Sequence, residues 1–160
     1  MARDAIARQY DVDADAVRLD IRKGEITFRA RKGRLVDLDK LHESIWATRL
    51  SGGTGMALNW IDVTAVGEVV IEKDRTVLKV AGSDQTFVLR EDPGAKKDGK
   101  TAFARLREAV GRGDKRVSVT GRLEGWHGHF PPFLSKLPPR PRVILVKGFA
   151  PVKPEARTRK

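Results

Sequence analysis

One stretch near the middle of the chain matches the spacing of a phosphate-binding loop, G-x-x-x-x-G-K-[ST]. It begins at Gly94 and ends with Lys100 and Thr101. In such a loop, backbone N–H groups face the phosphates, the lysine reaches the terminal phosphates and the hydroxyl binds Mg²⁺. The neighbouring residues argue against this chemistry, because Glu91 and Asp92 would stand beside the phosphate. We therefore expect a solvated loop whose threonine caps a helix, and no nucleotide hydrolysis.

A second group of residues that could do chemistry lies in a proline-rich stretch near the C-terminus. Its two histidines are ligands of the kind that bind transition metals, whereas the third histidine of the chain, His42, falls in a different predicted unit. Aromatic and cationic side chains also alternate there, which suits base stacking and phosphate contacts in single-stranded nucleic acid. The candidate nucleic-acid-binding residues are Trp126, Phe130, Lys136, Arg140 and Arg142, and the candidate metal ligands are His127 and His129.

Composition narrows the function classes. The chain has 32 Lys and Arg against 21 Asp and Glu, a formal net charge of +11, which attracts polyanions without specifying one. The lack of cysteine excludes disulfides, thiolate zinc sites, iron–sulfur clusters and cysteine nucleophiles. No G-x-S-x-G or H-E-x-x-H motif occurs, so we expect no enzyme and no cofactor. With neither an apolar membrane span nor a signal core, a cytoplasmic protein without membrane contact is expected.

Hydrophobic spacing in residues 2–60 predicts a short helix, a hairpin and a second helix. The first helix covers residues 2–10, and alternation of apolar and polar residues over 17–31 predicts the hairpin. Asp37 is placed to cap the second helix, which runs to about Leu50. Its apolar stripe consists of Leu38, Leu41 and Ile45.

These elements resemble the later portion of a heavy-metal-associated domain. The resemblance rests on three strings and a strand at 61–66; the strings are Val17-Arg-Leu-Asp-Ile, Gly24-Glu-Ile-Thr-Phe and Asp37-Leu-Asp-Lys-Leu. It implies a ferredoxin-like fold, of which this chain would keep a partial ββαβ unit and the remainder of the first helix. The family binds soft metals through a Cys-x-x-Cys loop that this chain lacks, so no metal-binding residue carries over. Either the chain is a degenerate member kept as a scaffold, or its true start lies upstream.

From residue 61 onward the pattern predicts three meandering strands, a helix and two further strands. The strands are expected at 61–71, 76–80, 85–90, 115–124 and 142–149, and the helix buries Phe103, Leu106 and Val110. In the first strand, alternate residues from Ile61 to Ile71 lie on one side, and in the fourth the residues that share one face are Val117, Val119, Gly121 and Leu123. This is the element order of the five-stranded OB barrel. Gly67 and Gly121 fall inside strands, where a small barrel needs bends. An open antiparallel sheet with one helix is the alternative fold. For the proline-rich loop, a separate alternative to nucleic-acid binding is that its aromatic residues close the mouth of the barrel and its prolines stiffen the loop.

The predicted fold class is therefore α+β. A partial ferredoxin-like unit over residues 1–60 packs on a five-stranded OB-like barrel over 61–150, and a disordered basic tail follows at 151–160. The strand at 61–71 is expected to serve both. The leading hypothesis is a non-enzymatic basic adaptor that binds single-stranded nucleic acid, or another polyanion such as an acidic protein partner. Two alternatives are a metal-ion-binding module whose histidines replace the lost cysteines, and a structural subunit of a larger complex.

Overall fold

The computed structural model describes residues 2–10, 12, 16–20, 22–30, 36–48, 59–124 and 141–153. The chain divides into two compact units. Described residues up to Asn59 belong to the first unit, and those from Trp60 onward belong to the second. Each unit buries its own set of apolar side chains.

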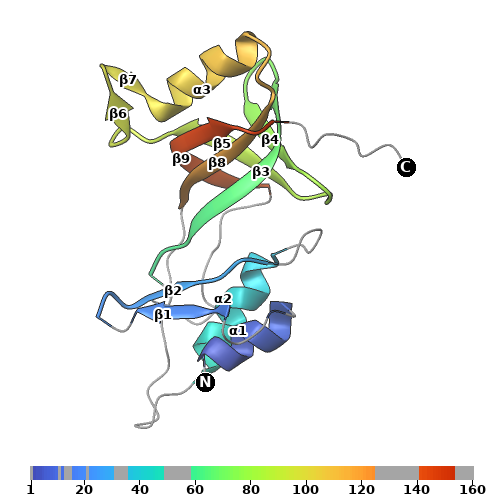
Figure 1. Ribbon diagram of the computed structural model, residues 1–160, viewed down its shortest axis with the longest axis vertical. Helices are drawn as coiled ribbons and strands as arrows, with labels where there is room; N and C mark the ends of the chain where they lie inside the picture. Colours follow the sequence, from blue (N-terminus) through green and yellow to red (C-terminus); the bar gives the residue numbers. More distant parts are fainter. Residues whose placement is uncertain are drawn as a thin grey trace. The chain divides into compact units, whose positions relative to one another are not determined.

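Two helices and a hairpin make up the described part of the first unit (Figure 1). In chain order these are α1 (Ala2–Tyr10), β1 (Arg18–Asp20), β2 (Glu25–Thr27) and α2 (Leu38–Ala47). The order agrees with the predicted helix, hairpin and helix, although both strands are shorter than the alternation over 17–31 indicated. Asp37 caps α2 as expected, because its carboxylate accepts a hydrogen bond from the N–H of Lys40 at 3.1 Å.

Apolar side chains of α1 and α2 form the core of this unit. The stripe predicted for α2 is buried in full, and α1 contributes Ile6 and Tyr10. Tyr10 stacks on Phe28 with ring centroids 5.1 Å apart, and its hydroxyl donates a hydrogen bond to the carbonyl oxygen of Asp37 at 2.7 Å. This bond ties the end of α1 to the residue that begins α2.

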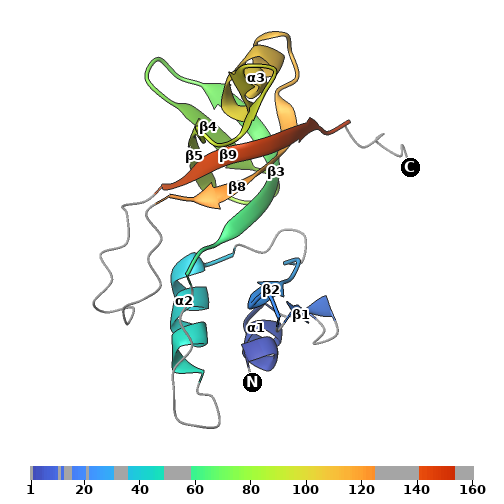
Figure 2. The ribbon, with the colours of Figure 1, turned by 90° about the vertical axis from the view of Figure 1, so that its left-hand side faces the viewer.

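The second unit is built on five strands whose hydrogen bonds close into a ring (Figures 1 and 2). The strands are β3 (Asp62–Ile71), β4 (Thr76–Val80), β5 (Thr86–Glu91), β8 (Arg116–Leu123) and β9 (Arg142–Pro151). Around the ring they follow the order β3, β4, β5, β9, β8, and β8 pairs back with β3. β5 and β9 run parallel while the other neighbours are antiparallel, so the sheet is mixed. The alternative of an open antiparallel sheet is therefore wrong.

A short hairpin and a helix connect β5 to β8. The hairpin consists of β6 (Lys96–Lys97) and β7 (Lys100–Thr101), and α3 (Ala102–Gly111) follows directly. The helix lies at one end of the ring, where it contacts β5 and β9 (Figure 2). Its Leu106 is fully buried. Counted along the chain, the helix thus comes between the third and fourth ring strands, β5 and β8, as the sequence predicts.

The predicted ferredoxin-like unit is not evident in the described part of the chain. There, β1 and β2 form a sheet of two strands by themselves. The strand that the resemblance assigned to that unit, residues 61–66, belongs to β3 of the ring. β3 hydrogen-bonds with β8 over Asp62–Glu68 and with β4 over Gly67–Ile71. Because these bonds are made within the ring, β3 does not pair with the β1–β2 hairpin. This differs from the expectation that the long strand would serve both units.

Alternate residues of the ring strands point inward and form its core. The inward face predicted for β8 is buried in full, and the largest buried side chains of the other strands lie beside it: Val69, Leu78, Phe87, Leu89, Ile144 and Val146. Ile71, by contrast, was expected to face inward with the rest of β3 but is 39% exposed. It is the last residue of its strand, next to the 72–75 turn, where fewer neighbours remain to cover it.

Two glycines allow the ring to close tightly. A Cβ on Gly67 would overlap the carbonyl group of Lys79 on β4, and one on Gly121 would overlap that of Leu145 on β9. Backbone atoms cannot move aside as flexible side chains can, so these positions admit no larger residue without displacing a strand. The predicted role of both glycines at bends of a small barrel agrees with these close approaches.

Three local features differ from the sequence-based expectation. The polar loop expected over residues 91–100 contains the β6–β7 hairpin. Phe103 is only half-buried, because it lies on the flank of α3 under the guanidinium of Arg107. Pro151 ends β9 and so does not belong to a disordered tail, while residues 154–160 of that tail lie outside the described part of the chain.

Candidate functional site

Of the candidate nucleic-acid-binding residues, Arg142 is in the described part of the chain. It begins β9, is half-buried and stands opposite Phe87 in the parallel register with β5. The remaining candidates lie outside the described residues: Trp126, His127, His129, Phe130, Lys136 and Arg140. The third histidine, His42, is buried in α2 of the first unit. Among the described residues, no group of three or more His, Asp or Glu side chains is placed to hold a metal ion.

The two described ends of the proline-rich segment meet at one edge of the ring. The N–H of Glu124, just after β8, donates a hydrogen bond to the carbonyl oxygen of Val143 in β9 at 2.9 Å. The Glu124 carboxylate also accepts a hydrogen bond from Arg90 Nη1 of β5 at 2.9 Å. The chain therefore leaves and re-enters the ring beside a charged pair that spans two strands.

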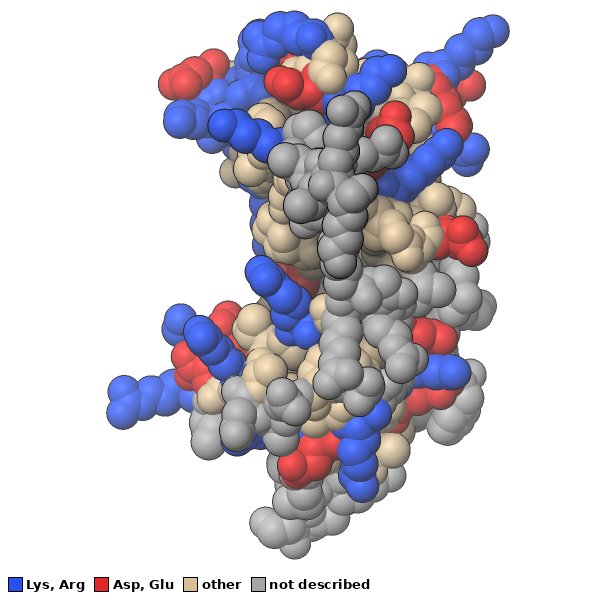
Figure 3. Space-filling model, turned by 45° about the vertical axis from the view of Figure 1, so that its right-hand side comes forward, with Lys and Arg blue, Asp and Glu red and all other residues tan. Residues whose placement is uncertain are grey.

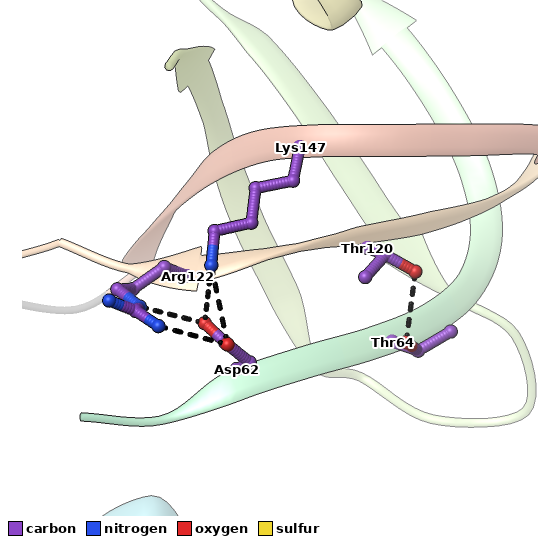
Figure 4. Close-up of polar contacts among 5 residues, drawn as sticks. All are labelled: Asp62, Thr64, Thr120, Arg122 and Lys147. Carbon is purple, nitrogen blue, oxygen red and sulfur yellow. Dashed lines mark hydrogen bonds and ion pairs between the residues drawn. The ribbon is translucent and has the colours of Figure 1, made fainter. Parts of the chain in front are cut away.

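Next to this edge, a carboxylate of β3 holds cations from two other strands (Figure 4). Arg122 of β8 donates to both oxygens of Asp62, with Nε–Oδ1 and Nη2–Oδ2 distances of 2.8 and 3.1 Å. Lys147 of β9 donates to the same two oxygens at 3.1 and 3.3 Å. Three strands are thus linked on the outside of the ring by one carboxylate.

Strand register explains why these side chains meet. Asp62 pairs with Arg122, which pairs with Leu145, which in turn pairs with Arg90, so one row crosses β3, β8, β9 and β5. All of these residues have the parity opposite to the buried core, because side chains alternate between the faces of a strand. Lys147 is the extra residue at the register shift opposite Thr120 and Gly121, and such a bulge re-aims its side chain.

An aromatic ring lies against this cluster. The guanidinium carbon of Arg122 stands 5.4 Å from the ring centroid of Trp60, within the range of a cation–π contact. Trp60 immediately precedes the ring strands and is 39% exposed. A large flat ring that stays accessible beside the Arg122 guanidinium offers a stacking surface next to positive charge.

A polar step continues along the same face. The hydroxyls of Thr64 and Thr120 hydrogen-bond to each other at 2.9 Å across β3 and β8, and both residues are exposed (Figure 4). They stand two residues along from Asp62 and Arg122, on the same outward parity. Beyond the cluster the face therefore presents small hydroxyl groups rather than bulky side chains.

Electrostatics ties the cluster together. The hydrogen bonds from Arg122 and, to a lesser extent, from Lys147 hold the pKa of Asp62 below its usual range, against the opposing effect of burial. The hydrogen bond to Asp62 in turn raises the pKa of Arg122, and the charge of Asp92 makes a smaller contribution. We name the group of Trp60, Arg90, Arg122 and Lys147, with Asp62 and Glu124 between them, the cationic belt. Arg142 is not part of it, because on β9 it has the same parity as the buried Ile144 and Val146.

Known proteins do not identify this arrangement. No protein-family model, curated protein or solved structure matches the chain. No described helix combines the length and the apolar character that a membrane crossing requires. The function must therefore be argued from the chemistry of the belt itself.

The belt can bind an anion because its ion pairs are easily exchanged. The side chains of Arg90, Arg122 and Lys147 are 60%, 42% and 35% exposed. Exposed ion pairs contribute only about 0–1 kcal/mol each, so a phosphate can compete with a carboxylate for the same cation at little cost.

The match to a phosphate-binding loop has a different structural basis. Asp98 and Gly99 have positive φ values of 52° and 77° and form the two-residue turn between β6 and β7. Lys100 pairs with Glu108, with a distance of 2.6 Å between Nζ and Oε1. Thr101 accepts a hydrogen bond from the N–H of Ala104 at 3.2 Å and so caps α3, as expected. A tight hairpin replaces the glycine-rich loop, so this geometry provides no cradle for phosphates.

Sequence reasoning missed most of the belt. Asp62 is 60 residues from Arg122 and 85 from Lys147, so no local motif contains the cluster. The available signal was that these residues occupy outward-facing positions of their strands. It shows which residues meet only when the register between the strands is known. Trp60 was overlooked because it precedes the first ring strand rather than lying within an aromatic-rich segment.

Proposed function

We propose that the second unit is an OB-like barrel that binds single-stranded nucleic acid along the cationic belt. The order of its strands supports the fold assignment. Numbered along the chain, the five ring strands occur in the order first, second, third, fifth, fourth, with a helix between the third and the fourth. The OB barrel has this arrangement, and its members bind oligonucleotides on the second and third strands and on the loops that follow the first and fourth strands. Of the belt, Arg90 is on the third strand and Glu124 begins the loop after the fourth.

The observation that carries the proposal is the exposed Trp60 ring beside Arg122, whose carboxylate partner Asp62 also accepts hydrogen bonds from Lys147. Proteins that bind single strands without sequence preference combine aromatic platforms for the bases with cations for the backbone. The belt provides both within one unit, on residues fixed by strand pairing. We infer that a base stacks on Trp60 while a phosphate takes over hydrogen bonds that Asp62 now accepts.

The position of the proline-rich segment supports the same assignment. One described end, Glu124, belongs to the belt and hydrogen-bonds to Val143 near the other end, and the segment connects the fourth and fifth ring strands counted along the chain. In OB barrels the loop between these strands contributes to the ligand surface. The aromatic and basic residues of that segment, Trp126, Phe130, Lys136 and Arg140, remain candidate ligand-binding residues from their sequence alone.

A direct test measures the binding of a fluorescently labelled single-stranded oligonucleotide by anisotropy at two salt concentrations. Wild-type protein should bind, and affinity should fall as salt rises, because phosphate contacts release counterions. Arg122→Gln and Lys147→Gln should each weaken binding and reduce the dependence on salt. Binding that does not change with salt, or the absence of binding, would refute the proposal.

Matched controls lie on the same strands. Arg116 is six residues before Arg122 on β8, and Lys153 follows β9 six residues after Lys147, which places each about 20 Å along the strand direction. Both are exposed. Arg116→Gln and Lys153→Gln remove the same charges at the opposite end of the strands and should change affinity much less. Equal losses in the paired variants would show that the net charge of the protein, and not the belt, determines binding.

The stacking surface has its own test. Trp60→Ala should weaken binding by about 1–3 kcal/mol, equivalent to about 5- to 150-fold, because one base loses its platform. Trp60→Phe keeps an aromatic face and should retain most of the affinity. If both variants bind like the wild type, Trp60 does not contact the ligand.

A further inference from the structure

A second basic surface lies at the end of the ring that carries α3, away from any exposed tryptophan in the described part of the unit. It consists of Lys96, Lys97, Lys100, Arg105 and Arg112, with Asp98 and Glu108 among them, and we name it the hairpin–helix surface. In Figure 3, Lys and Arg side chains project from the end of the molecule at which Figure 1 shows α3 and the hairpin. The surface has more positive than negative groups and is not part of the belt.

The β6–β7 hairpin places like charges opposite each other. Lys97 pairs directly with Lys100 across the hairpin. Lys96 precedes Lys97 on β6 and stands opposite Thr101 of β7, so its side chain projects from the other face of the hairpin. Like charges at directly opposite positions destabilise a strand pair. Lys100 is compensated by Glu108, but no ion pair joins Lys97 to another described residue. An anion bound at the hairpin would therefore relieve repulsion that the described fold leaves in place.

The helix extends this surface. Arg105, Glu108 and Arg112 are spaced three and four residues apart, so they share one face of α3. Glu108 links that face to the hairpin through Lys100, and these contacts hold the pKa of Glu108 below its usual value, with a smaller contribution from Arg112. The Nε of Arg105 is buried and has no hydrogen-bond acceptor among the described residues. The helix side thus adds guanidinium groups that one carboxylate cannot satisfy.

The surface lacks a place for a base. Phe103 is the one aromatic residue between Gly94 and Arg116. It lies on the other flank of α3, half-buried, with Arg107 over its ring at 6.0 Å. A ligand can therefore be held through its charges but not by stacking. This distinguishes the hairpin–helix surface from the belt, where Trp60 is accessible.

We propose that the hairpin–helix surface binds the sugar–phosphate backbone of a nucleic-acid duplex. A duplex hides its bases and presents one negative charge per about 1.7 Å of its axis, a density that suits a surface with cations and no stacking platform. Contacts of this kind carry no sequence information. With the belt engaged by a single strand, the second unit would bind where a single strand joins a duplex.

The experiment compares a blunt duplex with a single strand of the same length, using the full chain. Lys96→Gln combined with Lys97→Gln removes two exposed charges and leaves Lys100 and Glu108 paired. In this variant, duplex affinity should fall by about eightfold for each lost phosphate contact at 0.1 M salt, and the salt slope should decrease by about 1.8. Its single-strand affinity should stay close to that of the wild type.

The belt variant Arg122→Gln with Lys147→Gln is the reciprocal control. It should weaken the binding of the single strand and leave duplex binding unchanged. The circular dichroism spectra of both variants should match that of the wild type, which shows that they fold. The double variant Arg105→Gln with Arg112→Gln tests by its duplex affinity the helix side of the surface, independently of the hairpin.

The outcomes separate the two proposals. If the duplex does not bind, or binds the hairpin and helix variants as tightly as the wild type, the hairpin–helix surface is not a duplex site. If every variant weakens the binding of the duplex and of the single strand equally, both ligands bind one shared surface and the inference is overturned. If the belt variant binds the single strand as tightly as the wild type while the duplex results hold, the function proposed for the belt is refuted and the duplex site is retained.

Discussion

Asp62 and Arg122 lie directly opposite each other on β3 and β8, and two hydrogen bonds of 2.8 and 3.1 Å join them. The planar guanidinium matches both carboxylate oxygens at once, which fixes its orientation as well as its position. Trp60 lies against the same guanidinium. The pair therefore does two things: it links the strands of the ring, and it holds a cation beside an exposed aromatic ring.

This pair should contribute stability that depends on pH. The folded state lowers the pKa of Asp62, so its contribution is present above the unfolded pKa of about 3.9 and is lost as pH falls through the lower folded value. Because the side chains are partly exposed, we expect no more than about 1 kcal/mol. Asp62→Asn should reduce the free energy of unfolding at pH 7 by up to that amount, and the difference should shrink progressively as the pH falls below about 3.9. Urea unfolding at several pH values measures it.

The cause of the shift can be tested on the same carboxyl group. In the double variant Arg122→Gln with Lys147→Gln, the pKa of Asp62 should rise, because both donors are gone. Titration of the carboxyl carbon by NMR follows it directly. Arg116→Gln on the same strand should leave it where it is in the wild type. A pKa that does not move in the double variant would mean that other groups hold it down.

The two glycines of β8 and β9 should differ sharply in their tolerance of alanine. A Cβ on Gly121 overlaps the backbone of Leu145, whereas nothing lies within 4 Å of a Cβ on Gly148. Gly121→Ala should lower the free energy of unfolding by about 1–3 kcal/mol or more, because a strand must shift to make room. Gly148→Ala should change it by no more than about 0.5 kcal/mol. Similar values for the two variants, measured by urea unfolding, would contradict the close packing at Gly121.

Sequence patterns predicted the ring in some detail because its strands alternate cleanly. The inward residues of β8, including Val117 and Val119, were identified from period alone, and the helix was placed correctly between two strands. The β6–β7 hairpin escaped because two-residue strands of lysine and threonine carry no hydrophobic alternation. The belt escaped for another reason: it is made by register between strands far apart in the chain. The ferredoxin-like expectation was wrong because hydrophobic spacing does not say which partner a strand such as β3 will choose.

The threonine at the start of α3 should matter for stability rather than for phosphate binding. Thr101 is buried, caps the helix through Ala104, and donates a hydrogen bond to the Glu91 carboxylate at 2.8 Å. Thr101→Val keeps its shape and removes both bonds, so the free energy of unfolding should fall by about 1–2 kcal/mol. Thr101→Ser keeps the hydroxyl and should lose less than half as much. Equal losses in the two variants would mean that the methyl group contributes as much to stability as the hydroxyl does.

Tyr10 offers a prediction for the first unit at alkaline pH. Burial raises its pKa, and the nearby charge of Asp37 raises it further. A raised pKa contributes stability that is complete below the unfolded value of about 10 and is lost as pH rises toward the folded one. Because Tyr10 is the one tyrosine of the chain, phenolate absorbance reports on it alone. Its ionisation should therefore accompany unfolding, as judged by circular dichroism, rather than precede it.

The matched variant is Tyr10→Phe, which keeps the stacking on Phe28 and removes the hydroxyl that donates to the Asp37 carbonyl. At pH 7 it should be less stable than the wild type by about 0.5–1.5 kcal/mol, the usual net contribution of one hydrogen bond. Above pH 10 the wild type loses stability as its unfolded state ionises, and the variant has no phenol to ionise. The difference in the free energy of unfolding between the wild type and the variant should therefore narrow above pH 10. A difference that widens would show that Tyr10 ionises more readily in the folded protein than in the unfolded chain.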